Sequence, residues 1–211
     1  MVVAARLDCT DTYLQTRHRR PGIADPASQT RHRRPGIADP ASQTAPVVSG
    51  VIGVALSGMK RGDEVSEFEL PDQTGTTRSL SNLLMAGPIA LFFYPAAMTP
   101  GCTKEACHFR DLAAEFSAVG ATPVGISTDA VEKQAKFADM RKFNYPLLSD
   151  VDGTVATQFG VKRGLLGKLS PVKRTTFVID TDRKVLDVIS SEVNMDTHAD
   201  SALRVLRDRA R

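Results

Sequence analysis

Residues 88–112 read PIALFFYPAAMTPGCTKEACHFRDL, and the pattern of this stretch determines the fold around it. Its first part, residues 88–95, is a continuous apolar run bounded by Gly87 and Pro95, which is typical of a strand buried on both faces. From Cys102 onward, apolar residues recur at helical intervals, at positions 106, 109, 112, 113 and 116. We therefore expect a central strand, a short turn, and one helix that begins at Cys102.

The flanking segments continue an alternation of strands and helices. Extended segments with turn residues between them are expected at residues 64–70, 72–80, 121–128, 174–180 and 184–190. Helices are expected at residues 130–143, with Asp129 as a candidate cap, and at residues 196–211, where arginines lie near the C-terminal end. This order predicts an α/β fold with a mixed β-sheet flanked by helices and a functional site at the carboxyl end of a strand.

The first part of the chain has a different character. Residues 16–29 and 30–43 both read TRHRRPGIADPASQ, a tandem repeat of fourteen residues that is rich in arginine and proline and too weakly apolar to build a core. We expect residues 1–58 to be a disordered extension outside the natural protein, and residues 59–211 to form one domain, for which Met59 would be a natural start. The alternative is an arm whose arginines contact an acidic surface.

Charge and composition exclude several function classes. Residues 59–211 hold 20 basic and 20 acidic side chains, so the domain lacks the basic stripe of a nucleic-acid partner. No apolar run reaches the length of a membrane span, and no N-terminal signal sequence is present, which favours the cytoplasm. Three cysteines are too few for the disulfide framework of a small secreted domain, so we expect a chemical role for them.

The chemistry is expected at Cys102. In the first turn of a helix, unpaired backbone N–H groups and the helix dipole favour the thiolate, which is the reactive form of a cysteine. Arg174, at the head of a strand, is the candidate cation. Cys107 lies five residues further along the helix, where the two Cα atoms are about 8 to 9 Å apart. A disulfide requires less than about 7 Å, so pairing of these cysteines would require the helix to unwind.

The cysteines and their neighbours have other possible roles. A cysteine can be a small buried hydrophobic residue, and Cys102, Cys107 and His108 could be three metal ligands, but zinc sites use tight Cys pairs and a fourth ligand that is missing nearby. We therefore expect no metal. Glu105 is interpreted as a solvated helix charge and His108 as a surface residue, while His198 lies near a helix start without a partner that would make it a base.

Residues 92–112 resemble the active-site segment of peroxiredoxins of the peroxiredoxin Q or bacterioferritin comigratory protein type. Pro95, Thr99 and Cys102 fit the family signature P-x3-T-x2-C, and Cys107 falls where members with a resolving cysteine in the same helix carry theirs. Further segments that look like the family follow in the expected order: FELPDQTG, GIST, YPLLSD, FGV and KRTTFVID. The resemblance covers nearly all of residues 59–211 and nothing before them.

The resemblance implies a thioredoxin-like fold and the reduction of hydrogen peroxide or organic hydroperoxides. In this reading Cys102 is the peroxidatic cysteine and Cys107 the resolving cysteine, Thr99 and Arg174 hold the peroxide oxygens, and Pro95 shields the thiolate. Thioredoxin or a similar dithiol would recycle the enzyme, no metal or organic cofactor is required, and relatives imply a monomer or a weak homodimer.

One departure and two alternatives remain. Many relatives carry a lysine or an acid soon after the signature proline, where this chain has Ala96, Ala97 and Met98, so substrate preference does not carry over. A thiol:disulfide oxidoreductase on the same fold would normally show C-x-x-C at this helix start, which this chain lacks. A non-catalytic binding module with inert cysteines would show no peroxide turnover.

Overall fold

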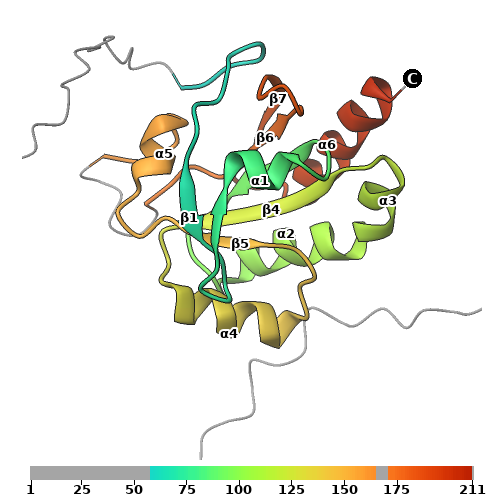
Figure 1. Ribbon diagram of the computed structural model, residues 1–211. Coiled ribbons are helices and arrows are strands. Elements are labelled where there is room, and N and C mark those ends of the chain that lie inside the picture. The colour runs from blue at the N-terminus through green and yellow to red at the C-terminus, as the bar shows by residue number, and fades with distance from the viewer. Residues whose placement is uncertain (1–57, 165–170, 211) are drawn as a thin grey trace, which may run out of the picture. The chain divides into compact units, whose positions relative to one another are not determined.

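The computed structural model describes residues 58–164 and 171–210 (Figure 1). Its strands are β1 (Glu69–Pro71), β2 (Thr77–Ser79), β3 (Ile89–Phe93), β4 (Thr122–Ser127), β5 (Leu147–Ser149), β6 (Thr175–Ile179) and β7 (Val185–Ser190). Its helices are α1 (Leu80–Leu84), α2 (Pro100–Asp111), α3 (Ala113–Ala118), α4 (Val131–Arg141), α5 (Thr154–Gln158) and α6 (Asp196–Arg209). The predictions for the tandem repeat and for Cys9 lie outside the described residues.

The main sheet has five strands in the order β5-β4-β3-β6-β7. The central strand β3 pairs in parallel with β4 and antiparallel with β6, so the sheet is mixed, as the sequence predicts. All five residues of β3 are buried, because both of its faces are covered. The strand that precedes Cys102 therefore lies in the interior of the fold, packed on both faces.

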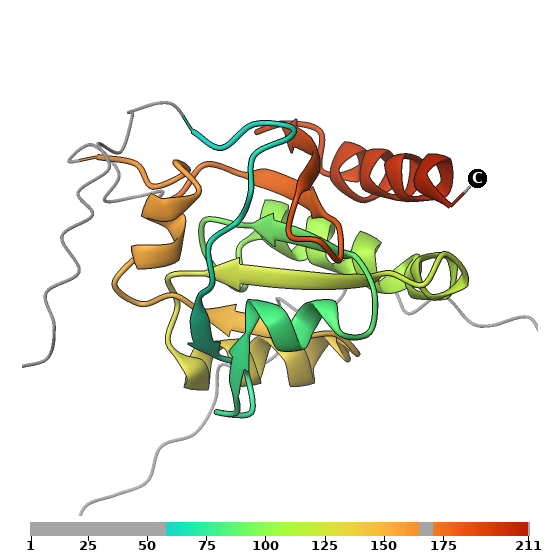
Figure 2. The same ribbon diagram turned by 45° about the horizontal axis from the view of Figure 1, so that its top comes forward.

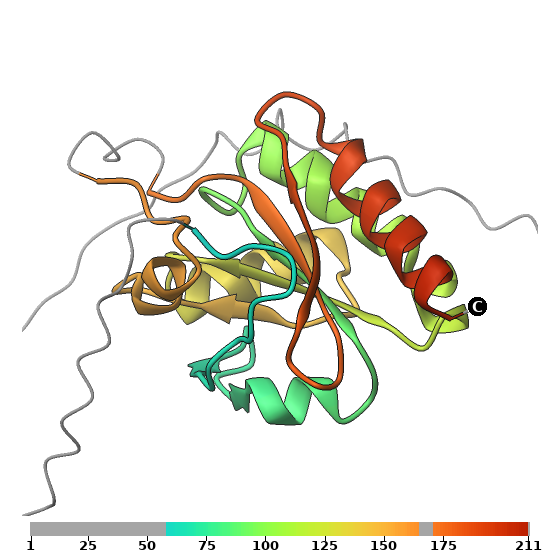
Figure 3. The same ribbon diagram turned by 90° about the horizontal axis from the view of Figure 1, so that it is seen from above.

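The two faces of β3 pack against different layers. Ile89, Leu91 and Phe93 contribute to a core beneath the β1–β2 hairpin, α1 and α5, whereas Ala90 and Phe92 contribute to a core beneath α2, α3, α4 and α6. Figures 2 and 3 show the hairpin and α1 on one face of the sheet, with α2 and α6 side by side on the other. This packing brings the start of α6 next to the helix that carries Cys102.

Several elements differ from the sequence-based expectation. The helix expected from Cys102 onward begins earlier, at Pro100, and is divided at Leu112 into α2 and α3, whose Phe109 and Phe116 rings pack 5.7 Å apart. The extended segments expected at residues 64–70 and 72–80 form the shorter strands β1 and β2, which within the described residues make a separate two-stranded antiparallel sheet. Strand β5 and helix α1 were not expected, because three to five residues are too few to display a periodic pattern.

A glycine in β4 fits the close packing behind the site. A Cβ atom at Gly125 would lie 2.7 Å from Leu147 Cδ2, closer than real Cβ atoms approach, and 3.0 Å from the ring of Phe92, which is tighter than most Cβ contacts. Because β4 can approach its neighbours this closely, Phe92 stacks on Phe109 of α2 with ring centroids 4.2 Å apart. This stack fixes the position of α2 over the sheet.

Candidate active site

Cys102 lies where the central strand passes into a helix. After β3, the loop of residues 95–99 leads to Thr99, the N-cap residue of α2, and Pro100 occupies the first helical turn, a position that proline favours. Cys102 is thus in the first turn, beside backbone N–H groups that have no helical partner. Its side chain is 1% exposed. The sulfur combines burial with the positive end of a helix dipole.

The loop before α2 is held in a strained turn. Met98 has a φ of 67°, a left-handed conformation that costs a non-glycine residue of order 1 kcal/mol. The backbone N–H of Ala97 donates to Asp129 Oδ2 at 2.6 Å, and the same carboxylate accepts from Ser127 Oγ at 2.9 Å. The prediction that Asp129 caps the next helix was wrong. The N-cap of α4 is Ala130, and Asp129 turns instead toward the loop.

Arg174 contacts the cysteine, in agreement with its role as candidate cation. It precedes β6 and is buried, and its Nη2 lies 3.3 Å from Cys102 Sγ. A Cβ atom at Gly101 would lie 3.5 Å from the same nitrogen, so the guanidinium lies over the first turn of α2. Burial lowers the pKa of Arg174, but the carboxyl of Glu105 and the Cys102 sulfur more than offset this, so the pKa is raised. The guanidinium is a permanent positive charge against the sulfur.

Glu105 is not the solvated helix charge that the sequence suggested. It is fully buried on the same face of α2 as Cys102, and its Oε2 accepts from Arg174 Nη1. Its other oxygen, Oε1, has no hydrogen-bond partner. Burial raises the pKa of Glu105 to about 8, although Arg174 opposes part of that rise. One guanidinium therefore serves two acidic groups, the Cys102 sulfur and the Glu105 carboxyl.

His198 is the second residue whose environment the sequence did not reveal. It lies in the first turn of α6, is fully buried, and places Nδ1 3.6 Å from Glu105 Oε1. The ring is held by the Thr176 hydroxyl, 2.9 Å from Nδ1, and by the carbonyl oxygen of Ser191, 2.9 Å from Nε2. Burial lowers the pKa of His198, so the neutral ring is favoured.

The protonation of Glu105 leads to a testable dependence of stability on pH. In the unfolded chain this carboxyl loses its proton near 4.5, and in the folded protein it keeps the proton up to about 8. The folded state binds more protons between these values, so the free energy of unfolding decreases as pH rises from about 4.5 to about 8. Below pH 6.5 His198 acts in the opposite sense, because its folded pKa is lowered.

We expect the Glu105→Gln variant, which mimics the protonated carboxyl, to lose the decrease in stability between pH 4.5 and 8. Urea denaturation at a series of pH values measures this directly. Glu132→Gln makes the same chemical change at an exposed glutamate of α4 and should leave the wild-type profile unchanged. A Glu105→Gln profile parallel to that of the wild type would contradict the assignment.

The other predicted site residues occupy the loop and the helix. Pro95 is half-buried directly after Tyr94, and the exposed Thr99 donates its hydroxyl hydrogen to the carbonyl oxygen of Ala96 at 3.0 Å. Cys107 is buried on α2. Cys102 is a free thiol, so these two cysteines are not bonded to each other. The structure thus brings Cys102 and Arg174 together and leaves the two cysteines five residues apart on an intact helix.

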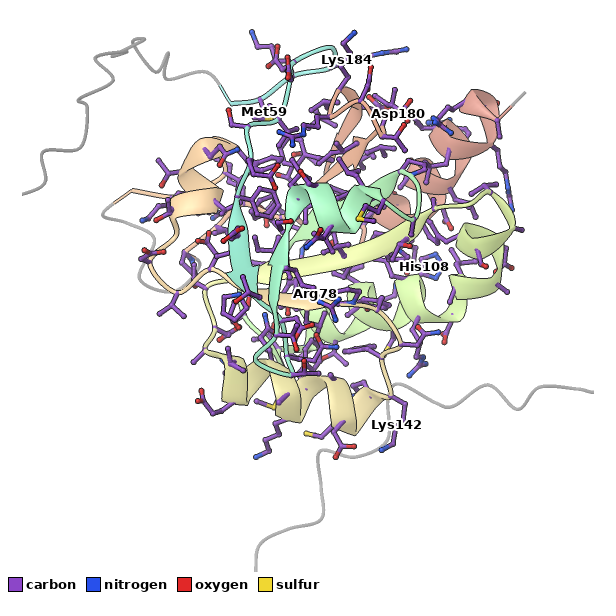
Figure 4. The ribbon with its side chains drawn as sticks, in the orientation of Figure 1. Met59, Arg78, His108, Lys142, Asp180 and Lys184 are labelled. Carbon is purple, nitrogen blue, oxygen red and sulfur yellow. The ribbon has the colours of Figure 1, made fainter. Side chains whose placement is uncertain are left out.

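The expected surface position of His108 is only partly met. Its side chain, labelled in Figure 4, is about a quarter exposed. Its Nε2 lies 2.9 Å from Asp200 of α6, so it contacts a neighbouring helix. Within residues 58–164 and 171–210, no group of three or more His, Cys, Asp or Glu side chains could hold a metal ion. No helix in the described part of the chain is long and apolar enough to cross a membrane.

Comparisons with known proteins identify the family of this chain. Residues 61–188 match the model of the AhpC/TSA family. The chain is 78% identical over 149 residues to a protein named a peroxiredoxin, Rv1608c of Mycobacterium tuberculosis, covering 71% of this chain and 97% of that protein. It is 38% identical over 158 residues to peroxiredoxin Bcp of Escherichia coli, covering 74% of this chain and all of that protein.

Solved structures give the same result. The crystal structure of peroxidoxin BcpB from Mycobacterium tuberculosis has a TM-score of 0.69 at 77% identity, covering 71% of this chain and 97% of that chain. Peroxiredoxin Q of Xanthomonas campestris has a TM-score of 0.62 at 31% identity, covering 68% and 92%. The thioredoxin-like fold predicted from the sequence is confirmed. The chain belongs to the AhpC/TSA family and is similar to its peroxiredoxins of the Bcp and peroxiredoxin Q type.

Proposed function

We propose that this chain is a thiol-dependent peroxidase that reduces hydrogen peroxide and organic hydroperoxides. The observation that carries the proposal is the free, buried Cys102 in the first turn of α2, with Arg174 Nη2 3.3 Å from its sulfur. Membership of the AhpC/TSA family supports the proposal. A second support is a similar solved structure, that of the Xanthomonas campestris bacterioferritin comigratory protein, which is described as giving insight into the alkyl peroxide reduction activity of that protein. An external thiol supplies the electrons.

The proposed reaction has three steps. The Cys102 thiolate attacks one peroxide oxygen, the O–O bond breaks, and the other oxygen leaves with its electron pair and takes up a proton, which gives a sulfenic acid on Cys102. The Cys107 thiol then condenses with the sulfenic acid, forming an S–S bond and releasing water. A dithiol such as thioredoxin finally exchanges with this disulfide and restores both thiols.

Each remaining residue has a role in this scheme. Arg174 and the backbone N–H groups of the first turn stabilise the charge that develops on the leaving oxygen, and the Thr99 hydroxyl helps to hold the peroxide. Pro95 limits the access of water to the thiolate. We further propose that residues 59–211 carry the whole activity, that the protein acts in the cytoplasm, and that it is a monomer or a weak homodimer.

The test starts from fully reduced protein, because Cys107 must be a thiol to act in the second step. One equivalent of hydrogen peroxide is added to the full chain, and the cysteine peptides are mapped by mass spectrometry. We expect a Cys102–Cys107 disulfide. A disulfide from Cys102 to Cys9 would replace Cys107 as the resolving residue, a lasting oxygen adduct on Cys102 would assign resolution to an external thiol, and no reaction would refute the peroxidase.

The role of Cys107 can be tested by the Cys107→Ser variant. We expect it to react with peroxide in a single turnover and to accumulate a sulfenic acid on Cys102, because the first step needs no second thiol. Multiple turnover with thioredoxin should fall to a small fraction of the wild-type rate. Cys9→Ser is the matched control and should cycle normally. Unchanged cycling of Cys107→Ser would show that this cysteine is not the resolving residue.

A further inference from the structure

His198 lies behind the site in a position that the peroxidase scheme does not use. It is fully buried, and no step of the proposed reaction touches it. Its Nδ1 is the polar atom that faces the unpartnered Oε1 of Glu105, at 3.6 Å. A buried carboxyl oxygen without a hydrogen bond is rare, because it forfeits the stabilisation that water gave it in the unfolded chain. The pair therefore calls for an explanation.

The hydrogen bonds of the ring determine where its proton is. The carbonyl oxygen of Ser191 can only accept, so Nε2 carries the hydrogen and donates it over 2.9 Å. In a neutral ring Nδ1 is then an acceptor, and it accepts from the Thr176 hydroxyl at 2.9 Å. An ionised Glu105 would thus face the lone pair of Nδ1 without a hydrogen between them. A proton on Glu105 removes this conflict, because a neutral carboxyl does not repel the lone pair of Nδ1.

We propose that His198 is a positioning residue whose neutral ring, facing Oε1, keeps a proton on Glu105 behind Arg174 and thereby keeps the positive charge of the guanidinium available to the Cys102 sulfur. With that proton in place, the Glu105–His198 pair is neutral overall, and the thiolate is the anion that Arg174 balances. When the proton leaves, the pair becomes negative and competes with Cys102 for the same guanidinium. Thiolate reactivity should then decrease at alkaline pH.

The surrounding charges agree with this arrangement. Cys102 faces the Glu105–His198 pair from α2, and Arg174 faces it from the start of β6. Glu192 faces it from the segment between β7 and α6, and its negative charge raises the pKa of Glu105. Glu192 forms its own ion pair with Arg163. Burial raises the pKa of Glu105 to about 8, which places the alkaline loss of the proton within the measurable range.

The inference rests on the proposed function only in taking peroxide as the substrate. The test therefore uses peroxide and also a second reagent that reacts with any thiolate. The full chain, first reduced, is reacted with hydrogen peroxide and separately with iodoacetamide between pH 5 and 10, and modification of Cys102 is followed by peptide mapping. His198→Gln keeps a donor to Ser191 and offers Glu105 an amide hydrogen, so it should favour the ionised carboxyl. We expect its alkaline limb to shift to lower pH by about one unit with both reagents.

Two further variants sharpen the result. Thr176→Val removes the competing hydroxyl and leaves Nδ1 to Glu105 alone, so its alkaline limb should shift in the opposite direction, to higher pH. His108→Gln is the matched control, because His108 also joins α2 to α6, through Asp200, but does not touch Glu105. A purely structural role for His198 would lower the rate at every pH without moving the limb.

The outcomes separate the two proposals. Shifted iodoacetamide profiles with no peroxide reaction in any variant would refute the peroxidase and support the role of His198 in keeping Glu105 protonated. Superimposed wild-type, His198→Gln and His108→Gln profiles would overturn that role. If His198→Gln does not fold, Thr176→Val decides alone, and an unshifted Thr176→Val profile also overturns the proposal.

Discussion

The Cys102→Ser variant is expected to reduce peroxide no faster than buffer without protein. A serine hydroxyl stays protonated at neutral pH and is a far weaker nucleophile than a thiolate, so the first step has no attacking group. The measurement is peroxide consumption in the presence of thioredoxin and its reductase, compared with the wild type.

The exchange of sulfur for oxygen is small, so this variant should keep the fold. Cys102 packs among the buried residues of the α2 face of the sheet, and its urea denaturation midpoint serves as the check. Cys107→Ser is the paired control, because it retains the attacking thiol and should still consume one equivalent of peroxide. Peroxide turnover by Cys102→Ser at any sizeable fraction of the wild-type rate would move the chemistry to another residue.

The Arg174→Met variant should react with peroxide about 100- to 1,000-fold more slowly, the loss typical of removing one preorganised charge from an active site. The guanidinium contacts both the sulfur and the Glu105 carboxyl, so the variant also leaves Glu105 without its hydrogen-bond donor. Because Glu105 keeps its proton at neutral pH, the expected cost is that of an unmade buried hydrogen bond, typically about 1 to 3 kcal/mol. Stopped-flow rates and urea denaturation measure the two effects separately.

A double variant distinguishes the catalytic from the structural effect of Arg174. Arg174→Met combined with Glu105→Gln leaves no carboxyl that could ionise, so the stability should no longer decrease toward pH 8 while the reaction with peroxide stays slow. Arg183→Met removes a half-buried arginine that pairs with Glu67 beyond the opposite end of β6, and controls for loss of a cation. Wild-type rates in Arg174→Met would exclude the guanidinium from the reaction.

The sequence predicts that Cys102 and Arg174 come together, because both residues lie at the ends of strongly patterned segments. Cys102 follows the continuous apolar run that becomes β3, and Arg174 precedes another apolar run that becomes β6. These two strands pair antiparallel in the centre of the sheet. The carboxyl end of β3 therefore meets the start of β6, and the two side chains converge. Such convergence follows from topology once the strands are recognised.

Glu105, His198 and Asp129 could not be assigned in the same way, because their partners come from distant parts of the chain. Each is charged or polar, and by itself such a residue is most often solvated. Two signals were nevertheless present. Glu105 is three residues from Cys102 and so shares its helix face, and His198 precedes Ala202 and Leu206 at intervals of four on the apolar stripe of α6. The spacing of Glu105 and His198 thus indicates that both lie on buried helix faces. Their hydrogen-bond and ion-pair partners become visible only in the tertiary structure.

Two hydrogen bonds bracket the segment that must open if Cys102 is to reach Cys107. Before it, the N–H of Ala97 is held by Asp129, and after its first turns, the hydroxyl of Tyr145 donates to the carbonyl oxygen of Ala106 at 2.7 Å. Opening between these points, over residues 98–105, would release the strained φ of Met98 and withdraw Cys102 from the core beneath α2, while the sheet and the core on its other face stay in place. Each catalytic cycle would then unfold only this short segment. The rest of the domain would stay folded, and the reductant could bind to it.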